Sequence, residues 1–291
     1  MTPSAIPPLK QQLKGRDLVV APGIFDMISV KVADAVGFNA LYMTGYGVTA
    51  SYLGLPDAGI TTYTDMVSRI RATKSISATP LVADGDTGYG GLLNVQHTVR
   101  GYEAAGAAAI QLEDQEFPKK CGHMLGRRVI ALEDMVAKIR VAVESRDSAD
   151  FLIVARTDAR TGYGLDEALK RGAAYAEAGA DVLFIESPES TEEMAKICQT
   201  FDTPLLVNMV EGGRTPVLSA KELTDLGYTL AIYPVTGFLA MGAALKSVYG
   251  HIKATGSSTG DTTPLENFEA FSRLMGFEHV WDFEKRWAGK G

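Results

Sequence analysis

The stretch "KKCGHM" at residues 119–124 surrounds a thiol with basic side chains. Two lysines precede Cys121, and Gly122 and His123 follow it. Cations stabilise a thiolate and can lower the pKa of a cysteine below its usual value of about 8.5. A single cysteine is more often a buried filler, but such polar neighbours do not resemble a protein core. The pattern therefore predicts a reactive thiol at Cys121.

Carboxylates from two parts of the sequence form a candidate metal site. "ADGDTGYGG" at residues 83–91 places Asp84 and Asp86 two positions apart, and Glu113 follows in "AAIQLED". Hard oxygen ligands of this kind suit Mg²⁺, with Mn²⁺ as an alternative, rather than Zn²⁺. An Asp-x-Asp pair alone is equally typical of a solvated turn. The prediction therefore requires Glu113 to reach the same point.

Two further patterns indicate anion binding. Arg156 in "VARTDAR" offers a planar guanidinium that can hold a carboxylate through two parallel hydrogen bonds, although a salt bridge would be its structural role. The glycine-rich "MTGYGVT" at residues 43–49 offers backbone N–H groups that can bind a second carboxylate. A metal ion beside two anion sites predicts a small di-acid, or a 2-oxo or 2-hydroxy acid, as the ligand.

The elements that must position these residues alternate between strands and helices. Eight short apolar runs recur, and segments with helical spacing, several ending in glycine, lie between them. The runs are "LVVAPG" from Leu18, "ALYMTG" from Ala40, "PLVADG" from Pro80, "AAIQLED" from Ala108, "FLIVART" from Phe151, "DVLFIES" from Asp181, "PLLVNM" from Pro204 and "LAIYPV" from Leu230. The helical segments include 65–75, 95–105, 132–143, 165–178 and 220–226, with Gly37, Gly106, Gly179 and Gly227 at helix ends. This alternation predicts parallel strands.

Eight strand–helix units predict an α/β fold that closes into a (β/α)8 TIM barrel. An open doubly wound sheet would more often show about five or six strands and a glycine-rich phosphate turn, and "VAPGIFD" is not such a turn. We expect a catalytic barrel domain over residues 1–252. Residues 253–291 form a separate extension, in which "KATGSSTGDTTP" (253–264) links the barrel to an amphipathic helix over 265–274.

Active sites of such barrels lie at the carboxyl ends of the strands, and polar residues stand at most of these positions here. Any single one is equally well explained as a helix cap, but that role does not explain why all of them coincide. The positions are 42–46, Asp84, Asp86, Glu113, Asp114, Arg156, Asp158, Glu186, Asn208 and Pro234. The segment 115–130, which carries Cys121, is longer than a usual connection and is expected to be a lid over this face.

The composition and the first residues limit the partners and the cellular location to be expected. The formal net charge of −7 argues against nucleic acid as a partner. The first residues, "MTPSAIPPLKQQLKGRD", contain no apolar run, so we expect neither a signal peptide nor a membrane anchor, and a cytoplasmic location. Two cysteines in a chain of this size fit free thiols in a reducing compartment. Cys198, His97, His251 and His279 lie in helical segments without convergent partners and are expected to be structural or exposed.

Together these motifs resemble the isocitrate lyase / phosphoenolpyruvate mutase superfamily over essentially the whole chain. The matching stretches, in the family's order, are "VAPGIFD", "YMTGYG", "PDAGITT", "VADGDTGYGG", "QLEDQEFPKKCGHM", "VARTDAR", "IESP" and "NMVEGG". "KKCGH" is typical of the carbon–carbon lyases, whereas phosphonomutases carry an asparagine-containing lid motif, so the mutase activity is disfavoured. The resemblance implies a TIM barrel whose additional C-terminal helix is swapped between subunits, usually in a homotetramer.

The resemblance also implies roles for individual residues. Asp84 matches the direct Mg²⁺ ligand, and Asp57, Asp86 and Glu113 match residues that hold its waters. Tyr42 or Glu113 matches the base, Cys121 the acid, and Lys120 and His123 the groups that tune the thiol. Positions that contact the substrate or support its site are Thr44, Gly45, Tyr46, Asp84, Gly122, Arg156, Glu186, Asn208 and Pro234.

The expected reaction is the Mg²⁺-dependent retro-aldol cleavage of a substituted malate to a 2-oxo acid and a short carboxylic acid. Lyases for tricarboxylates carry an arginine after "YPxSxF", whereas Leu239 stands in that region here, which favours a substrate like 2,3-dimethylmalate unless Arg214 supplies the charge. Alternatives are methylisocitrate lyase, oxaloacetate decarboxylase, phosphonomutase and oxaloacetate hydrolase, which carries a hydroxyl residue where Pro234 stands. A non-catalytic small-acid-binding protein ranks last.

Overall fold

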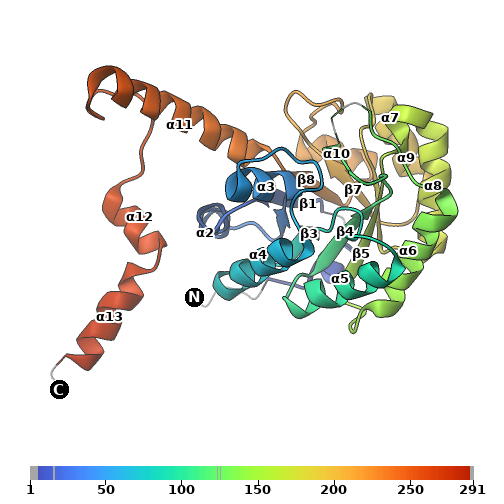
Figure 1. The fold of residues 1–291 in the computed structure, drawn as a ribbon, viewed down its shortest axis with the longest axis horizontal. Coiled ribbons are helices and arrows are strands. Elements are labelled where there is room, and N and C mark those ends of the chain that lie inside the picture. Colours follow the sequence, from blue (N-terminus) through green and yellow to red (C-terminus); the bar gives the residue numbers. More distant parts are fainter. Residues whose placement is uncertain (1–5, 16, 123, 125, 289–291) are drawn as a thin grey trace.

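The computed structural model describes residues 6–15, 17–122, 124 and 126–288, and it contains a closed barrel of parallel strands (Figure 1). Each strand pairs with the next along the chain, and β8 closes the barrel by pairing with β1, with Val19 opposite Leu230. The strands are β1 (Val19–Ile24), β2 (Leu41–Met43), β3 (Leu81–Asp84), β4 (Ala109–Glu113), β5 (Leu152–Thr157), β6 (Val182–Ile185), β7 (Leu205–Asn208) and β8 (Leu230–Tyr233). The predicted TIM barrel and its eight strands are confirmed.

Alternation along the strands explains why the polar residues face the barrel axis. On β3, Leu81 and Ala83 pack into the apolar layer shared with the helices, whereas Val82 belongs to the cluster inside the barrel. Side chains two positions apart on a strand share a face. Asp84 therefore continues the inner row that starts at Val82. The same spacing places Arg156 above Val154 on β5, so apolar residues fill the barrel while polar ones end at its mouth.

Helices cover the barrel, and their ends follow the sequence signals. Asp26 accepts a hydrogen bond from the Ser29 backbone at 2.7 Å, and this cap starts α2. The glycines expected at helix ends all have positive φ values, from 92° at Gly37 to 113° at Gly227, so left-handed glycine stops these helices. The elements are α1 (Leu9–Gln12), α2 (Met27–Val36), α3 (Gly45–Leu53), α4 (Tyr63–Ile76), α5 (Leu92–Ala104), α6 (Leu132–Ser145), α7 (Ala159–Tyr163), α8 (Leu165–Glu177), α9 (Thr191–Thr200) and α10 (Ala220–Leu226).

The C-terminal part leaves the barrel instead of covering it. Helix α11 (Thr236–Thr255) projects outward, α12 (Phe268–Leu274) follows and approaches α2, and α13 (Phe277–Trp287) continues away from the barrel (Figure 1). None of these three helices has a buried residue. Apolar side chains remain exposed along them, with Phe268 at 88% and Trp281 at 43%. Phe238 at the start of α11 packs on Phe25 and Tyr46, but the tail as a whole exposes more large apolar side chains than a surface element usually does.

The tail differs from its predicted form in two places. The linker begins at Gly256, where a φ of 72° ends α11, and not at Lys253, which is still helical. Helix α12 (Phe268–Leu274) occupies most of the segment 265–274 in which a helix was predicted, and α13, which was not predicted, follows after Gly276, where φ is 102°. The boundary expected between residues 252 and 253 therefore falls inside α11. Across the described residues, no helix combines the length and the apolar character needed to cross a membrane.

Candidate active site

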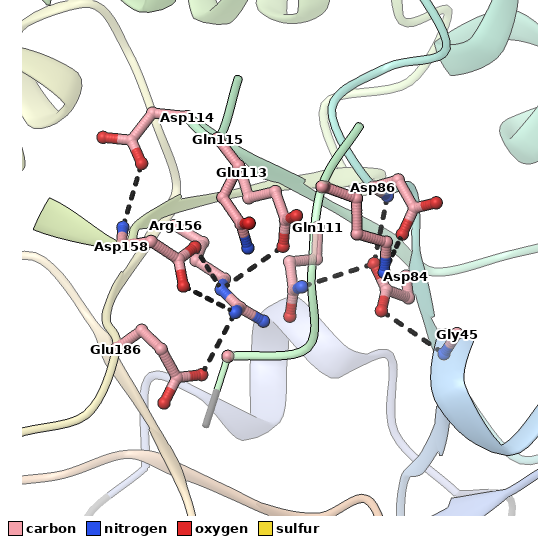
Figure 2. Close-up of polar contacts among 12 residues, drawn as sticks. Gly45, Asp84, Asp86, Gln111, Glu113, Asp114, Gln115, Arg156, Asp158 and Glu186 are labelled. Carbon is pink, nitrogen blue, oxygen red and sulfur yellow. Dashed lines mark hydrogen bonds and ion pairs between the residues drawn. The ribbon is translucent and has the colours of Figure 1, made fainter. Parts of the chain in front are cut away.

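Asp84 at the end of β3 is held in one orientation by its neighbours. Its Oδ2 accepts a hydrogen bond from the Gly45 backbone N–H at 3.3 Å, and its Oδ1 accepts from the Asp86 N–H at 3.0 Å and from Gln111 Nε2 at 3.4 Å (Figure 2). A Cβ at Gly45 would lie 2.7 Å from Asp84 Oδ2, so only glycine allows this approach. The carboxylate is thus fixed at the barrel mouth before any ligand arrives.

Lys119 joins the other acidic groups of the same region. Its Nζ lies 2.5 Å from Asp57 Oδ1 and 2.6 Å from Asp86 Oδ1, and the lysine is 2% exposed. Burial raises the pKa of Asp86 to about 7, against the opposing effect of Lys119, and the Asp84 and Asp57 carboxylates add to the rise. Asp86 also has a φ of 46°, which is uncommon outside glycine. From sequence alone, Lys119 was expected only to be a basic neighbour of Cys121.

Glu113 on β4 reaches the same region, as the metal prediction required. It is 1% exposed; its Oε2 lies 3.4 Å from Arg156 Nε, while Oε1 has no hydrogen-bond partner among the described residues. Burial raises the pKa of Glu113 well above its ordinary value, although Arg156 opposes the shift. An orphaned buried oxygen of this kind fits a group that hydrogen-bonds to a ligand or to a metal-bound water.

The donor set fits a hard cation held largely through water. Within the described ranges, no three His, Cys, Asp or Glu side chains converge closely enough to hold an ion directly. Mg²⁺ usually keeps several waters and takes only one or two carboxylates from the protein. If such an ion binds here, Asp84 would be the residue to hold it, and Asp57, Asp86 and Glu113 would accept hydrogen bonds from its waters.

Arg156 on β5 lies among three carboxylates. Its guanidinium donates from Nε to Asp158 Oδ2 at 2.9 Å and from Nη2 to Asp158 Oδ1 at 2.8 Å, and it lies 3.5 Å from Glu186 Oε2 (Figure 2). The guanidinium lies over the ring of Phe184, with the Cζ atom of Arg156 5.0 Å from the ring centroid. Burial would lower the pKa of Arg156, but the carboxylates outweigh it and raise that pKa well above its ordinary value. The group is a permanent buried cation.

The site has two halves, one around Asp84 and one around Arg156, and Glu186 and Asn208 extend the half around Arg156. Asn208 Nδ2 donates to Glu186 Oε2 at 3.1 Å, and the Ser187 hydroxyl donates to Glu186 Oε1 at 3.1 Å. The same hydroxyl lies 3.0 Å from the Gly122 carbonyl oxygen, so its single proton is shared between the two acceptors, and Ser187 has a φ of 60°. Strained backbone of this kind tends to gather at functional sites. These residues join the end of β6 to the segment that carries Cys121.

Tyr42 and Gln111 form the floor between the two halves. The Tyr42 hydroxyl donates to Gln111 Oε1 at 3.0 Å, while the Gln111 amide nitrogen faces Asp84. Burial raises the pKa of Tyr42 well above 10, and the Asp84 carboxylate adds to the rise. Sequence reasoning missed Gln111, although a glutamine two positions before Glu113 on one strand must share its inward face.

The turn after β2 and the end of β8 complete the mouth. Thr44 Oγ1 accepts from the Gly47 N–H at 3.3 Å and caps α3, whose free N–H groups favour an anion. The ring of Tyr46 packs on Phe238 with centroids 5.0 Å apart. A Cβ on Gly23 would lie 2.5 Å from the Pro234 carbonyl oxygen, so β1 and the end of β8 are in close contact. Pro234 is buried beside this contact.

The active-site loop, defined as residues 115–130, is docked onto the mouth. The Gln115 side-chain amide donates to the Lys120 carbonyl at 2.8 Å and accepts from the Lys120 N–H at 2.9 Å. A Cβ on Gly122 would lie 2.4 Å from Arg156 Nη2 and 2.8 Å from Glu186 Oε2, so the loop backbone rests directly on these side chains. Cys121 is half-buried between the two anchors, Lys119 and Gly122.

Some predicted site residues lie elsewhere. The Lys120 amine donates to the Gly126 carbonyl at 3.1 Å on the exposed side of the loop and does not face the acidic groups. His123 lies outside the described residues. Asp114, one residue beyond Glu113, points away from the other labelled carboxylates and accepts a hydrogen bond from the Asp158 N–H (Figure 2). It also accepts hydrogen bonds from Thr157, Arg171 and Tyr175. It is a structural residue between β5 and α8.

The chain is a TIM barrel whose mouth carries a buried acidic cluster, a buried arginine and a thiol-bearing loop. The sequence matches the family model of phosphoenolpyruvate phosphomutase over residues 9–253. The chain therefore belongs to the phosphoenolpyruvate mutase / isocitrate lyase superfamily, as its motifs indicated.

Named relatives cover nearly the whole chain. A 2,3-dimethylmalate lyase of Eubacterium barkeri is 49% identical over 280 residues, which cover 96% of this chain and 97% of the relative. A 2-methylisocitrate lyase of Aeropyrum pernix is 41% identical over 96% of this chain and 88% of the relative.

Solved structures agree in fold. An oxaloacetate acetylhydrolase bound to 3,3-difluorooxalacetate superposes with a TM-score of 0.91 at 33% identity, covering 98% of each chain. A crystal structure of 2,3-dimethylmalate lyase gives 0.90 at 36% identity, covering 97% of this chain and 94% of that one. A phosphonopyruvate hydrolase in complex with oxalate and Mg²⁺ gives 0.86 at 31% identity, covering 96% and 97%. The shared fold thus serves several reactions of small acids.

Proposed function

We propose that this chain is a Mg²⁺-dependent carbon–carbon lyase that cleaves a substituted malate of the 2,3-dimethylmalate type. The observation that carries the proposal is the docking of the active-site loop. Lys119 is fixed on Asp57 and Asp86, and Gly122 is packed on Arg156. Cys121 therefore lies at the mouth between the acidic cluster and Arg156. An acid at this position can protonate the carbon of the fragment that leaves.

The two halves of the site suit the two ends of a dicarboxylate. Arg156 and the N-terminus of α3 offer positive charge to carboxylates, and Asn208 adds an amide beside Glu186. When bound at Asp84, Mg²⁺ would supply charge stabilisation for the substrate oxygens. The buried cluster of Asp84, Asp86 and Glu113 keeps bulk water from screening these interactions.

Glu113 is the better of the two candidate bases. Tyr42 uses its hydroxyl proton to bind Gln111, and its raised pKa keeps it protonated at neutral pH. Glu113 Oε1 has no hydrogen-bond partner among the described residues, and the raised pKa of Glu113 makes its carboxylate a stronger base than an ordinary one, while Arg156 beside Oε2 favours the carboxylate form. In the proposed step the substrate hydroxyl gives its proton to Glu113, the C2–C3 bond breaks, and C2 becomes the carbonyl of a 2-oxo acid.

Cys121 then completes the reaction. The electron pair of the broken bond passes to C3 and its carboxylate, and the Cys121 thiol delivers a proton to C3 to give a short carboxylic acid. The thiolate then takes a proton from solvent and Glu113 releases the proton it accepted, so that both groups return to their starting forms. The docked loop excludes water from the carbanion until this transfer is complete.

Charge placement favours a dicarboxylate over a tricarboxylate. Leu239, in the region where tricarboxylate lyases carry an arginine, is 49% exposed in the first turn of α11. Arg214, the other candidate for a third carboxylate, pairs with Glu189 at 2.9 Å. Oxaloacetate hydrolysis is the second candidate, supported by the likeness to an oxaloacetate acetylhydrolase, but Pro234 offers no hydroxyl at the end of β8.

A substrate panel tests the proposal. Purified protein with Mg²⁺ is mixed with 2,3-dimethylmalate, other alkylmalates, methylisocitrate and oxaloacetate, and released 2-oxo acid and carboxylic acids are identified. We expect alkylmalates to be cleaved, and EDTA to stop the reaction until Mg²⁺ is restored. Faster turnover of methylisocitrate, or release of oxalate and acetate from oxaloacetate, would reassign the substrate. Absence of any turnover would leave the small-acid-binding alternative.

We also propose that the tail packs on a second copy of the chain, in a homotetramer with exchanged C-terminal helices. Large apolar side chains of α11, α12 and α13 are exposed in this chain, and α2 exposes Ile28, Val32 and Val36 as a further apolar surface. Burying such side chains is worth about 25 cal/mol per Å² of apolar area. Exchange of tails between copies would bury both surfaces together.

A further inference from the structure

Asp158 is buried at the end of β5 and determines how Arg156 is oriented. Its two oxygens accept parallel hydrogen bonds from Arg156 Nε and Nη2, at 2.9 and 2.8 Å. Glu113 and Glu186 approach the same guanidinium only to 3.4 and 3.5 Å, each through a single oxygen. A bidentate pair fixes the plane of a guanidinium as well as its position. Asp158 therefore sets the direction from which Arg156 can meet a substrate carboxylate.

The same carboxylate binds a residue of the active-site loop. Arg127 forms a buried ion pair with Asp158 Oδ1, donates from Nη2 to Thr161 Oγ1 at 2.6 Å, and donates from Nε to the Met124 carbonyl at 3.1 Å. Burial would raise the pKa of Asp158, but the two arginines outweigh it and hold that pKa below its ordinary value. Arg127 of the loop and Arg156 of the site thus bind the same carboxylate, that of Asp158.

A rigid layer behind Asp158 keeps this shared anion in place. The Asp158 N–H donates to Asp114 Oδ1 at 2.9 Å, and Asp114 in turn is held by Arg171 on α8 at 3.1 Å. Arg171 also donates to the carbonyl of Ile130, the last residue of the loop, at 3.0 Å. Asp158 therefore cannot follow Arg127 if the loop moves. Loss of the Arg127 contact would leave Arg156 as the only cation on Asp158.

We propose that Asp158 is a positioning residue that couples docking of the active-site loop to the orientation and available charge of Arg156, with Arg127 as the loop's half of the contact. When Arg127 is docked, it neutralises part of the Asp158 charge, so Arg156 can direct more of its charge to a substrate anion. The same contact holds Met124 and the chain beside Cys121 against the mouth. This role rests on the proposed lyase function.

The neighbouring arginine provides a matched control. Arg128 pairs with Glu116 at 2.6 Å on the surface, and its side chain is 74% exposed, against 1% for Arg127. Arg127→Met and Arg128→Met remove the same charge from adjacent loop positions. Arg127→Lys keeps a positive charge but lacks the several planar N–H donors of a guanidinium. All three variants are compared in circular dichroism and thermal melting, so that loss of folding is recognised directly.

Kinetics test the coupling. We expect Arg127→Met to lower kcat/KM on the order of 100-fold, the effect of misplacing a site by about 1 Å, with both a higher KM and a lower kcat. Arg127→Lys should recover part of this loss, and Arg128→Met should stay near wild type. In a double-mutant cycle, Arg127→Met and Asp158→Asn should be strongly non-additive, because both remove one contact. Additive effects, or equal effects of the two arginine variants, would overturn the proposal.

A second readout does not depend on activity. The rate at which iodoacetamide alkylates Cys121 reports how firmly the loop is docked, and Arg127→Met should raise this rate several-fold while Arg128→Met leaves it unchanged. Equal rates in wild type and Arg127→Met would refute the loop contact even in an active enzyme. If wild type cleaves no substrate but the alkylation rates differ as expected, the lyase function fails and the contact between Arg127 and Asp158 that docks the loop stands.

Discussion

At the scale of single residues, the site consists of two charged halves joined by Gln111. Its carbonyl oxygen accepts from Tyr42, and its amide nitrogen donates to Asp84. One uncharged side chain thus orients both a candidate metal ligand and a neighbouring hydroxyl. Groups that orient a metal ligand commonly contribute 10–100-fold to metal affinity or activity.

Gln111→Leu should therefore weaken Mg²⁺ binding and lower kcat/KM by about 10–100-fold, while the protein stays folded. Isothermal titration with Mg²⁺ and steady-state kinetics measure the two effects. Gln199→Leu, on the exposed side of α9, provides the control for the loss of an amide. An unchanged Mg²⁺ affinity in Gln111→Leu would show that Asp84 does not depend on this contact.

The two thiols should differ in reactivity. Burial raises the pKa of Cys198 to about 12, although Tyr228 opposes the shift. A raised pKa keeps the unreactive thiol form, so at pH 8 only about one Cys198 in 10,000 is a thiolate. We expect iodoacetamide at pH 8 to label Cys121 first, with Cys198 reacting only as the pH rises toward 12. Peptide mass spectrometry measures this, and equal labelling at pH 8 would contradict it.

At the scale of elements, the active-site loop depends on close backbone packing at Gly122. A methyl group there would meet Arg156 Nη2 at 2.4 Å and Glu186 Oε2 at 2.8 Å. Gly122→Ala should displace the loop and lower kcat/KM by about 100-fold with little change in global stability. Gly91→Ala is the matched control, since a Cβ there meets nothing within 4 Å. Comparable losses in both variants would contradict a specific role for the packing at Gly122.

The elements themselves were largely predictable from sequence. Runs such as "FLIVART" have the length and β-branched content of buried parallel strands, and glycines such as Gly179 mark helix ends because only glycine adopts a φ near 100° without strain. The tail was harder to predict. Whether Lys253 continues a helix depends on packing that periodicity does not report, and the break at Gly276 separates two helices that share one amphipathic pattern.

Site residues could be predicted where a charged residue stands at the end of a strand. They could not be predicted where the direction of a side chain determines whether it enters the site. Asp84, Glu113 and Arg156 were recognised because charged residues end inward-facing rows. Lys119 and Lys120 are adjacent and chemically identical, yet one is buried between carboxylates and the other lies on the surface. No sequence pattern distinguishes them, because the difference comes from the path of the loop.

At the scale of the whole molecule, the projecting tail should determine assembly. Removing residues 257–291 takes away α12 and α13 and should shift the protein from a tetramer to smaller species, with lower thermal stability. Light scattering coupled to size-exclusion chromatography measures the mass of each form. Replacing Phe268 and Trp281 with serine tests the same surface in the full-length chain. A full-length chain that is monomeric at micromolar concentration would refute the proposed assembly.

The central claim is that Cys121 protonates the carbon released when a substituted malate is cleaved. The most direct measurement incubates the enzyme with Mg²⁺ and 2,3-dimethylmalate in D₂O and follows the products by NMR, for wild type and for Cys121→Ser. The account predicts pyruvate and propionate from wild type, with one deuterium at C2 of propionate. It predicts no turnover by Cys121→Ser, with Mg²⁺ affinity unchanged. Near-normal cleavage by Cys121→Ser would contradict it.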